Sequence, residues 1–346
     1  MSKKTLAIFG ATGQQGSSLT SHIHSSPTLT STYSLRLISR TPASPVALAL
    51  SDRYGPDNIT LVHGDATILS SLLTALAGVD VVFAMNAPVF GPDRFNVEYS
   101  MGRNMCDAAI TCGVSYFIFS TLPSVRDMSS GQFTAVTPFD AKAATEAYIR
   151  KRCEEDGVSM KCAFVSPGMF MQNFGAQGFL NPRRVGAGEY GGNEEEVWAL
   201  QRPFPASNKM PYIDAVADVG KFVGAILAAP DKFAGVTMLA SQGLYTQDEI
   251  VAAIVKTTGK KVVYQQVSVE EFAKIIEFLG GFAEIFVEGF QAQAMYGYYG
   301  LGTDEKVAWA AEQAETQGRL TTLEEYLEKN PVFLAREDDQ RKGPDL

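Results

Sequence analysis

The chain has 346 residues, of which 46% are hydrophobic, and this fraction is enough to fill the core of one large or two modest domains. The net charge is −9 and the isoelectric point is near 5.0, so we expect no direct nucleic-acid partner and no anionic membrane partner. The first strand follows residues 1–4 directly, and no apolar segment reaches the length of a membrane span. These features predict a soluble, cytoplasmic protein.

The first expected element is a strand at residues 5–9, which runs into three glycines spaced G-x-x-G-x-x-G. In dinucleotide-binding folds Gly10 would permit the tight turn, Gly13 would let the backbone approach a pyrophosphate, and Gly16 would let the next helix pack on the sheet. Free N–H groups at the start of that helix, at residues 14–24, favour an anion. The alternative is a glycine-rich turn that binds nothing. We predict a dinucleotide-binding loop formed by Gly10, Thr12, Gly13, Gln14, Gln15 and Gly16.

Short apolar runs and helical segments then alternate along the chain. Further strands are expected at residues 34–39, 59–63, 79–85, 116–120 and 159–165. Helices are expected between them at residues 45–54, 68–76, 95–112 and 139–156. This alternation predicts an α/β fold with a doubly wound parallel sheet of Rossmann type. A ligand of such a sheet lies outside the carboxyl ends of the strands, so the loops after the strands carry the candidate site.

The second strand ends in Ser39 and Arg40. An NAD-specific site usually has an acidic residue here for the ribose hydroxyls, whereas a guanidinium pairs with a 2′-phosphate. Ser39 and Arg40 therefore favour NADP(H) over NAD(H), and the alternative is a solvated charge at the end of a strand.

Two further loops offer candidate contacts to the cofactor. After the third strand, Asp65 and Ala66 can lie beside the adenine, although Asp65 can equally well cap the helix that follows. After the fourth strand, Asn86, Ala87 and Pro88 are small or polar and can line the pyrophosphate and the nicotinamide ribose. Asn86 can also do no more than satisfy a turn.

The fifth strand ends at Ser120, and the next long helix carries Lys142. In short-chain dehydrogenases a serine at this strand end works with a Tyr-x-x-x-Lys pair, in which tyrosine donates a proton and lysine lowers the tyrosine pKa and holds the nicotinamide ribose. Here the tyrosine position is Pro138, which has no proton to donate. We therefore consider Lys142, Tyr298, Tyr299 and water as proton donors.

Cysteine and histidine residues indicate no metal site. The four cysteines lack the spacing of a zinc site or of a disulfide framework, so we expect free thiols at Cys106, Cys112, Cys153 and Cys162. The histidines are expected to be solvated residues rather than catalytic bases, with His22 and His24 on the helix after the glycine loop.

The second half of the chain differs in composition and lacks the regular alternation of strands and helices. Residues 166–209 are rich in glycine, proline, asparagine and aromatic residues and read as an insertion over the carboxyl edge of the sheet. A helix at 213–228 and a strand at 235–240 would return to the main sheet, and a helix, a strand and a helix would follow at 244–258, 261–267 and 269–279. We predict a Rossmann domain of residues 1–165 plus about 212–242, a smaller discontinuous α+β domain of about 166–211 plus 243–335, and a loose tail at 336–346.

The motifs taken together resemble the NmrA-like family, an atypical branch of the short-chain dehydrogenase/reductases that is related to the isoflavone and phenylcoumaran ether reductases. The matching segments are the glycine loop, Ser39-Arg40, residues 139–148 with Lys142 but without the tyrosine that would stand four residues before it, residues 166–174 with a Pro-Gly-x-Phe-x-x-Asn pattern, and residues 297–300. Relatives often follow the strand-end arginine with another basic residue, whereas Thr41 stands here.

The resemblance implies a Rossmann domain and a smaller domain that together form a cleft for NADP(H). It places Lys142 near the nicotinamide ribose. It also implies a loop beside the nicotinamide with the residues Gly168, Met169, Phe170 and Asn173.

The family resemblance implies two classes of function. The first is an NADPH-dependent reductase of an aromatic or conjugated small molecule, motivated by expected cleft residues such as Phe170, Phe174, Phe179, Trp198, Phe204 and Tyr212. The alternative is a catalytically silent NADP(H) sensor that binds a protein partner in nitrogen-metabolite or redox regulation and can be nuclear. Pro138 motivates this alternative. We favour the reductase, because the sensor has no positive sequence feature of its own.

Overall fold

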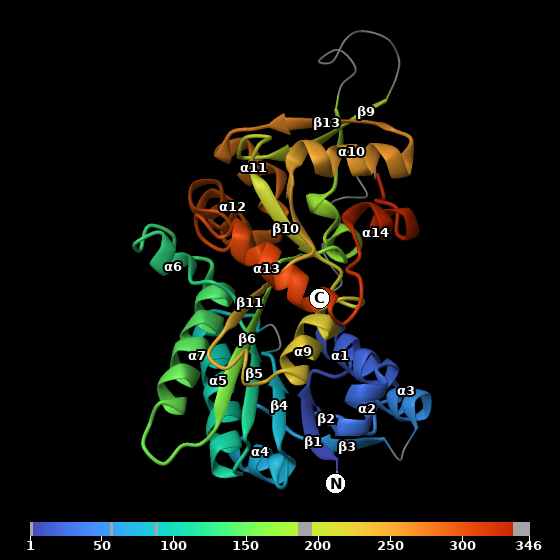
Figure 1. Cartoon of the computed structure of the whole chain (residues 1–346). Coiled ribbons are helices and arrows are strands. Elements are labelled where there is room, and N and C mark those ends of the chain that lie inside the picture. Colours follow the sequence, from blue (N-terminus) through green and yellow to red (C-terminus); the bar gives the residue numbers. More distant parts are fainter. Residues whose placement is uncertain (1–2, 56–57, 87–88, 186–195, 335–346) are drawn as a thin grey trace.

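A computed structural model describes residues 3–55, 58–86, 89–185 and 196–334 of the chain. The predicted cofactor residues Ala87 and Pro88 and the predicted tail at 336–346 lie outside the described residues. Figure 1 shows a lower unit built around one large sheet and an upper unit of short strands and helices. The carboxyl ends of the strands in the large sheet point toward the upper unit.

The large sheet has seven strands in the order β11-β6-β5-β4-β1-β2-β3, and every neighbouring pair is parallel. Leu6 of β1 pairs with Leu35 on one side and with Val81 on the other, and the strand order reverses at this point. The strands are β1 (Lys4–Phe9), β2 (Tyr33–Ser39), β3 (Ile59–His63), β4 (Val81–Ala84), β5 (Tyr116–Ser120), β6 (Lys161–Pro167) and β11 (Thr237–Ala240). The predicted doubly wound Rossmann-type sheet is thereby confirmed.

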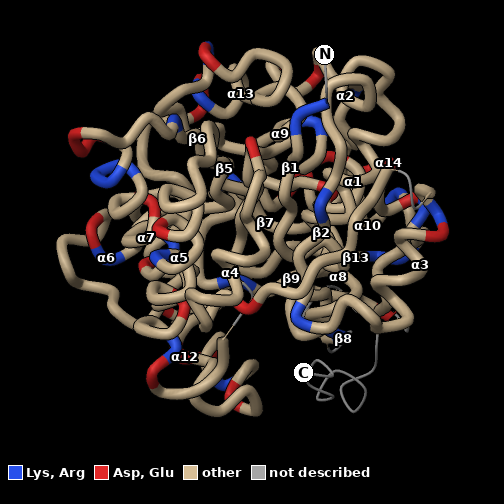
Figure 2. Tube along the Cα trace, turned by 90° about the horizontal axis from the view of Figure 1, so that it is seen from below, with Lys and Arg blue, Asp and Glu red and all other residues tan. Residues whose placement is uncertain are grey.

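Alternate residues of the strands face two separate layers of helices, so the large sheet is buried on both sides. In β5, Tyr116 and Ile118 belong to one core, and Phe117 and Phe119 belong to the other. The first layer contains α1 (Gln14–Ser25), α2 (Pro27–Thr32), α3 (Pro45–Tyr54), α9 (Val219–Ala228) and α13 (Asp304–Glu315), and the second contains α4 (Leu69–Leu76), α5 (Arg94–Thr111) and α7 (Thr137–Cys153). Figure 2 shows the charged residues mainly around the outside of these layers.

The upper unit contains two three-stranded sheets, in the orders β12-β10-β7 and β13-β9-β8. Their strands are β7 (Met169–Phe170), β8 (Arg183–Val185), β9 (Val197–Arg202), β10 (Lys209–Ile213), β12 (Gly243–Thr246) and β13 (Lys261–Gln266). The helices are α8 (Asn173–Ala176), η1 (Gly178–Leu180), α10 (Gln247–Thr258), α11 (Val269–Ile275), η3 (Glu277–Phe282), α12 (Ala283–Tyr296) and α14 (Leu323–Lys329). The short α6 (Val125–Met128) lies below α12 in the lower unit.

The aromatic residues that we expected to line the cleft form the core of the upper unit. Phe174, Phe179, Trp198, Phe204 and Tyr212 are all buried in one hydrophobic cluster there. Because their side chains pack against one another, they supply stability rather than a ligand surface.

Two helices begin three or more residues later than the sequence predicts. The helix expected at 213–228 begins at Val219, because Ile213 ends β10 and pairs with β7. The helix expected at 244–258 begins at Gln247, because Thr246 ends β12 and caps α10 through its hydroxyl. α13, at residues 304–315, packs against α9 and β11 of the lower unit.

Within the described ranges, no helix is long and apolar enough to cross a membrane.

Candidate functional site

The glycine loop forms the turn between β1 and α1, next to the point where the strand order reverses. Gly10 has a φ of +63°, in the left-handed region that other residues rarely adopt. A Cβ atom at Gly16 would lie 2.3 Å from the carbonyl oxygen of Gly10, so only glycine lets α1 begin this close to the turn. Gly13 caps α1 without a side-chain hydrogen bond, and the first turn has no acidic residue. The first N–H groups of α1 therefore form an open anion site, beside the exposed Thr12 and Gln14.

Gln15 differs from its neighbours in the loop because its side chain is buried. Its Oε1 atom accepts a hydrogen bond of 2.8 Å from the hydroxyl of Ser120, at the end of β5. The serine that short-chain dehydrogenases use near the substrate therefore holds the start of α1 in this chain.

The predicted adenosine contacts lie at the ends of β2 and β3. Arg40 is exposed, and the Oγ atom of Ser39 accepts a hydrogen bond from the backbone N–H of Thr41. The Oδ1 atom of Asp65 accepts hydrogen bonds from the hydroxyl and the backbone N–H of Thr67. These bonds lower the pKa of Asp65, with smaller contributions from nearby charges that include Arg40. Asp65 thus caps the turn at Thr67 and not α4 itself, whose N-cap is Ile68 without a side-chain hydrogen bond.

The carbonyl oxygen of Ala66 accepts a hydrogen bond from the side chain of Asn104 on α5. This contact fixes the loop after β3 against the second layer of helices.

Lys142 lies on α7 and makes an ion pair with a residue that the sequence did not reveal. Its Nζ atom is 2.7 Å from Oε2 of Glu98 and 3.3 Å from the carbonyl oxygen of Pro138. Glu98 is buried, and its carbonyl oxygen accepts a hydrogen bond of 2.8 Å from Nδ2 of Asn86. The Oδ1 atom of Asn86 is buried without a hydrogen-bond partner among the described residues. The residues predicted to hold the nicotinamide ribose thus meet around Glu98.

A pattern in the sequence points to Glu98. It lies on the buried stripe of α5, four residues before Gly102 and seven before Met105. A carboxylate at a buried position of a helix needs a hydrogen-bonding or cationic partner. This need could have marked Glu98 as a candidate site residue from the sequence.

The loop predicted beside the nicotinamide joins the two units. Met169 and Phe170 form β7, which pairs with β10, and Asn173 begins α8. A Cβ atom at Gly168 would lie 2.9 Å from the carbonyl oxygen of Pro211, so this glycine allows the close approach to β10.

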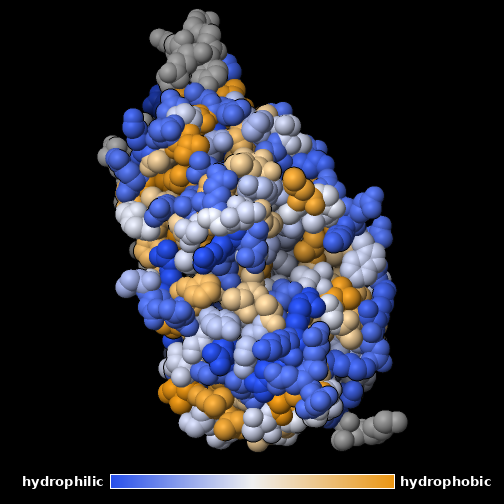
Figure 3. Space-filling model, turned by 90° about the vertical axis from the view of Figure 1, so that its left-hand side faces the viewer, coloured by the Kyte–Doolittle hydropathy of each residue, from blue (hydrophilic) through white to orange (hydrophobic). Residues whose placement is uncertain are grey.

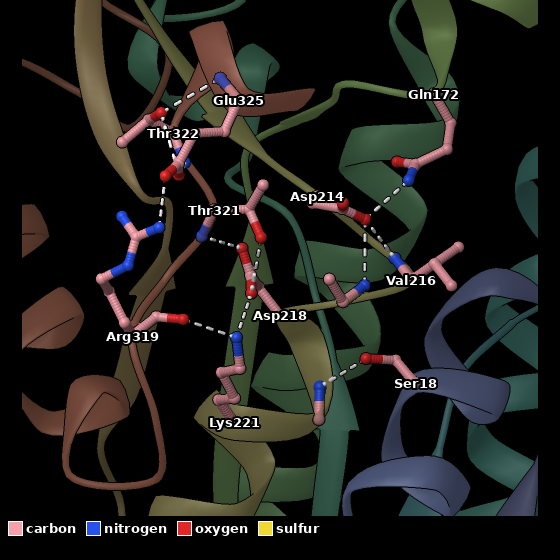
Figure 4. Close-up of polar contacts among 12 residues, drawn as sticks. Ser18, Gln172, Asp214, Val216, Asp218, Lys221, Arg319, Thr321, Thr322 and Glu325 are labelled. Atoms are coloured by element: carbon pink, nitrogen blue, oxygen red, sulfur yellow. Dashed lines mark hydrogen bonds and ion pairs between the residues drawn. The ribbon is translucent and has the colours of Figure 1, made fainter. Parts of the chain in front are cut away.

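Gln172 holds the same loop against the start of α9, as Figure 4 shows. Its Nε2 atom donates a hydrogen bond of 2.7 Å to Asp214, and its Oε1 atom accepts one from the N–H of Ala215. The buried Asp218 pairs with Lys221 and accepts a hydrogen bond from the N–H of Thr321. These contacts connect the nicotinamide loop, α9 and the segment before α14.

The two tyrosines considered as proton donors face backbone carbonyl groups. The hydroxyl of Tyr298 donates to the carbonyl oxygen of Pro167 at 3.3 Å, and that of Tyr299 donates to Ser166 at 3.1 Å. Burial raises the pKa of both phenols. Because a raised pKa makes a phenol less ready to release its proton, these contacts fit an anchoring role at the end of β6 better than acid catalysis.

An apolar cavity lies between α6, α7, β7 and α12. Its wall includes Phe139, one helical turn before Lys142, and Met169, next to Gly168. The other lining residues are Val125, Met128, Val136, Ile285, Phe286, Gly289, Phe290, Ala292, Gln293, Gly297 and Tyr298. On this side of the molecule, hydrophobic side chains reach the surface at the level where the two units meet (Figure 3).

The surroundings of the cysteine residues and of His22 are those of packed side chains rather than of metal ligands. All four cysteines are free, and burial raises the pKa of the Cys106 thiol to about 12. Among the described residues, no group of three His, Cys, Asp or Glu side chains is placed to hold a metal ion. The expectation of a solvated His22 is wrong, because α9 packs against it: a Cβ atom at Gly224 would lie 2.5 Å from its ring.

A model of the NmrA-like family matches residues 2–327. The chain belongs to the NmrA-like family. An NmrA-like family domain-containing oxidoreductase of Penicillium ochrochloron is 25% identical over 327 residues, which cover 88% of this chain and 89% of that protein.

Two solved structures share the NmrA-like fold. NmrA, a negative transcriptional regulator crystallised with NADP, has a TM-score of 0.70 and 20% identity, with 95% of both chains covered. The triphenylmethane reductase of Citrobacter sp., crystallised with NADP(H), has a TM-score of 0.66 and 20% identity, with 94% of this chain and 99% of that chain covered. These likenesses concern the fold, which a regulator and a reductase share.

Proposed function

We propose that this NmrA-like protein binds NADP(H) and reduces an aromatic or conjugated small molecule. The observation that carries the proposal is the apolar cavity, because Phe139 and Met169 in its wall come from the same two segments as Lys142 and Gly168. A substrate in this cavity would therefore lie beside the nicotinamide half of the site. The reductase and the oxidoreductase among the compared proteins support the same chemistry.

The residues present fit a dinucleotide. The open N-terminus of α1 suits the pyrophosphate, since Gly10 and Gly16 carry no Cβ atom that would crowd the turn. Arg40 is exposed and suits a 2′-phosphate, and NADP(H) in the two neighbouring structures agrees with this assignment. The Oδ1 atom of Asn86, which has no hydrogen-bond partner among the described residues, and the ammonium of Lys142 suit the ribose hydroxyls. When bound, NADPH supplies a hydride.

The side chains of this chain favour conjugate reduction over ketone reduction. Pro138 removes the usual acid, and the hydroxyls of Tyr298 and Tyr299 already donate to backbone carbonyl groups. Reduction of a quinone or an enone needs less acid assistance, since the charge that develops is delocalised and water can protonate it. The apolar wall excludes water from the reacting ring while the ring is bound.

The volume of the cavity limits how much of a substrate can be enclosed. Its volume is about 110 Å³, somewhat below the roughly 150 Å³ of an engineered cavity that binds benzene. We therefore infer that one flat ring enters, with the rest of the molecule outside.

The test follows NADPH absorbance with a panel of quinones, enones and aryl ethers. Wild-type protein is expected to turn over at least one class. Gly289→Leu, which fills the cavity from α12, is expected to abolish turnover and leave NADPH binding unchanged. Glu284→Leu puts the same side chain on the exposed surface of α12 and serves as the control. NADPH binding without turnover of any class would overturn the reductase.

A catalytically silent sensor is the second candidate. Two observations favour it. One is that Lys142 is paired with Glu98 while Pro138 stands where the proton-donating tyrosine would be. The other is that NmrA, a transcriptional regulator, shares the fold. This candidate requires a protein partner whose binding changes between NADP and NADPH. Partner pull-downs with each cofactor test it, and equal capture in both states would contradict it.

A further inference from the structure

We propose that Glu98 is a positioning residue for the nicotinamide half of the site, where it fixes Lys142 and two residues of the loop after β4, Asn86 and Val89. The inference rests on the proposed dinucleotide site and deepens it. The evidence is a set of contacts that bring α5, α7 and that loop to one buried carboxylate.

The first contact orients Lys142. Its Nζ atom lies 2.7 Å from Oε2 of Glu98, and the exposed fractions of the two side chains are 15% and 1%. An ammonium has three donors. Among the described residues, Glu98 and the carbonyl oxygen of Pro138 take two of them, which leaves one N–H for a ligand. Glu98 thereby fixes the direction of the donor that would reach a ribose hydroxyl.

The second set of contacts holds the loop after β4. The Oε1 atom of Glu98 accepts a hydrogen bond of 3.4 Å from the N–H of Val89, and the backbone carbonyl oxygen accepts one from Asn86. Both carboxylate oxygens are therefore engaged, each with a different segment. A change of the Glu98 side chain would release Lys142 and the N–H of Val89 together, whereas the bond from Asn86 to the backbone carbonyl oxygen would remain.

Stability alone does not account for this arrangement. Burying a carboxylate and an ammonium costs several kcal/mol in lost hydration, and apolar residues of similar volume often serve the fold as well or better. The same two helices are also joined by an ion pair between Asp107 and Arg152. The side chains of this pair are 29% and 24% exposed, so they lose less hydration than Lys142 and Glu98. The buried pair is explained if the position of Lys142 matters to a ligand.

The Asp107 pair provides a matched control. Asp107 lies nine residues after Glu98 on α5, which corresponds to about 13.5 Å of helix. It also joins α5 to α7, through Arg152 and the hydroxyl of Tyr148, but away from the site. Asp107→Ala therefore removes a carboxylate contact between the same two helices without touching Lys142.

The experiment compares two ligands by calorimetry on the full chain. NADPH carries the nicotinamide ribose, whereas adenosine 2′,5′-bisphosphate has only the adenosine half. Glu98→Ala is expected to weaken NADPH about tenfold or more, since a charge-assisted contact is lost, and to leave the bisphosphate within about twofold. Glu98→Gln is expected to recover part of the loss, because its amide oxygen can still accept from Lys142 while its amide nitrogen cannot accept from Val89.

Each outcome decides the proposal. Equal weakening of both ligands by Glu98→Ala, or the same NADPH loss in Asp107→Ala, would assign Glu98 to general stability and overturn the positioning role. An unchanged NADPH affinity in Glu98→Ala would overturn it as well. If wild-type protein bound the bisphosphate but not NADPH, or bound neither, the proposed function itself would fail, and this is seen before any variant is made.

Discussion

The side chains of Gln15 and Ser120, 105 residues apart in the chain, share a buried hydrogen bond of 2.8 Å. Gln15 lies in the first turn of α1, and Ser120 ends β5, which is separated from β1 by β4. The contact thus crosses the carboxyl edge of the sheet at the point where the strand order reverses. It fixes the start of α1, where the open N–H groups lie, to the centre of the large sheet.

Ser120→Ala tests this contact. Without the hydroxyl, Oε1 of Gln15 would stay buried without this donor, which costs about 1–3 kcal/mol of unfolding free energy. Urea unfolding measures the loss. Ser115→Ala is the control, because its hydroxyl also bonds at 2.8 Å, to the carbonyl oxygen of Asp80, but in an exposed position. A loss in Ser120→Ala no larger than in Ser115→Ala would contradict the importance of the buried contact.

Gly16→Ala is expected to disrupt the dinucleotide loop. The new Cβ atom would lie 2.3 Å from the carbonyl oxygen of Gly10 and 2.7 Å from Cα of Ala11, and both are backbone atoms that cannot rotate away. The start of α1 must shift, so we expect NADPH affinity to fall by at least about tenfold, as one lost charge-assisted contact would cause. Calorimetry measures this effect.

The control for that variant is Gly175→Ala on α8, where a Cβ atom meets nothing within 4 Å. Alanine is a better helix former than glycine, so this change is expected to be neutral or slightly stabilising. Wild-type NADPH affinity in Gly16→Ala would argue against the loop as the pyrophosphate site.

The elements that the sequence predicted well have strong local signals. α3 matches the expected residues 45–54, because Ser44 caps it, Pro45 starts it, and Gly55 with a φ of +87° ends it. β3 matches the expected residues 59–63 for a similar reason: its apolar run is bounded by polar residues and a glycine.

Other features depend on contacts that are distant in the sequence, and local patterns do not reveal them. Ile213 belongs to a strand because β7 and β12 lie beside β10, although its own sequence continues into a helical pattern. The hydroxyl of Tyr298 reaches the carbonyl oxygen of Pro167, 131 residues earlier. The spacing on α5 marks Glu98 as a buried carboxylate, but no local pattern identifies its partner, Lys142, which lies 44 residues further on. The strand-end residues of the site were predictable, since the topology of a parallel sheet places them together.

Arg40→Ala tests the preference for the 2′-phosphate. Arg40 is exposed at the end of β2, so removing its side chain is not expected to affect the core. A phosphate contact contributes about 1.5–3 kcal/mol, so the Kd for NADP should rise about tenfold or more while that for NAD stays nearly constant. Arg53→Ala, an exposed arginine at the end of α3, is the control for a general loss of positive charge. Equal changes in both constants would remove the argument for the phosphate.

His22 is expected to make stability depend on pH. Burial between α1 and α9 lowers its pKa, a hydrogen bond with Gln317 opposes part of this effect, and the charge of Lys221 adds a smaller lowering contribution. In the unfolded chain a histidine titrates near pH 6.5. Just below that pH the unfolded chain therefore binds more protons than the folded chain, and the unfolding free energy falls as the pH drops.

His22→Gln removes this titration while keeping a polar side chain against Gly220 and Gly224. Urea unfolding between about pH 7.5 and pH 5.5 measures the slope of unfolding free energy against pH. The wild type should lose stability below about pH 6.5, and the loss should be smaller in the variant because glutamine does not take up a proton. The same slope in both proteins would show that His22 is not the group responsible. A shallower slope in the variant would show that protonation of the imidazole of His22 contributes to the loss of stability.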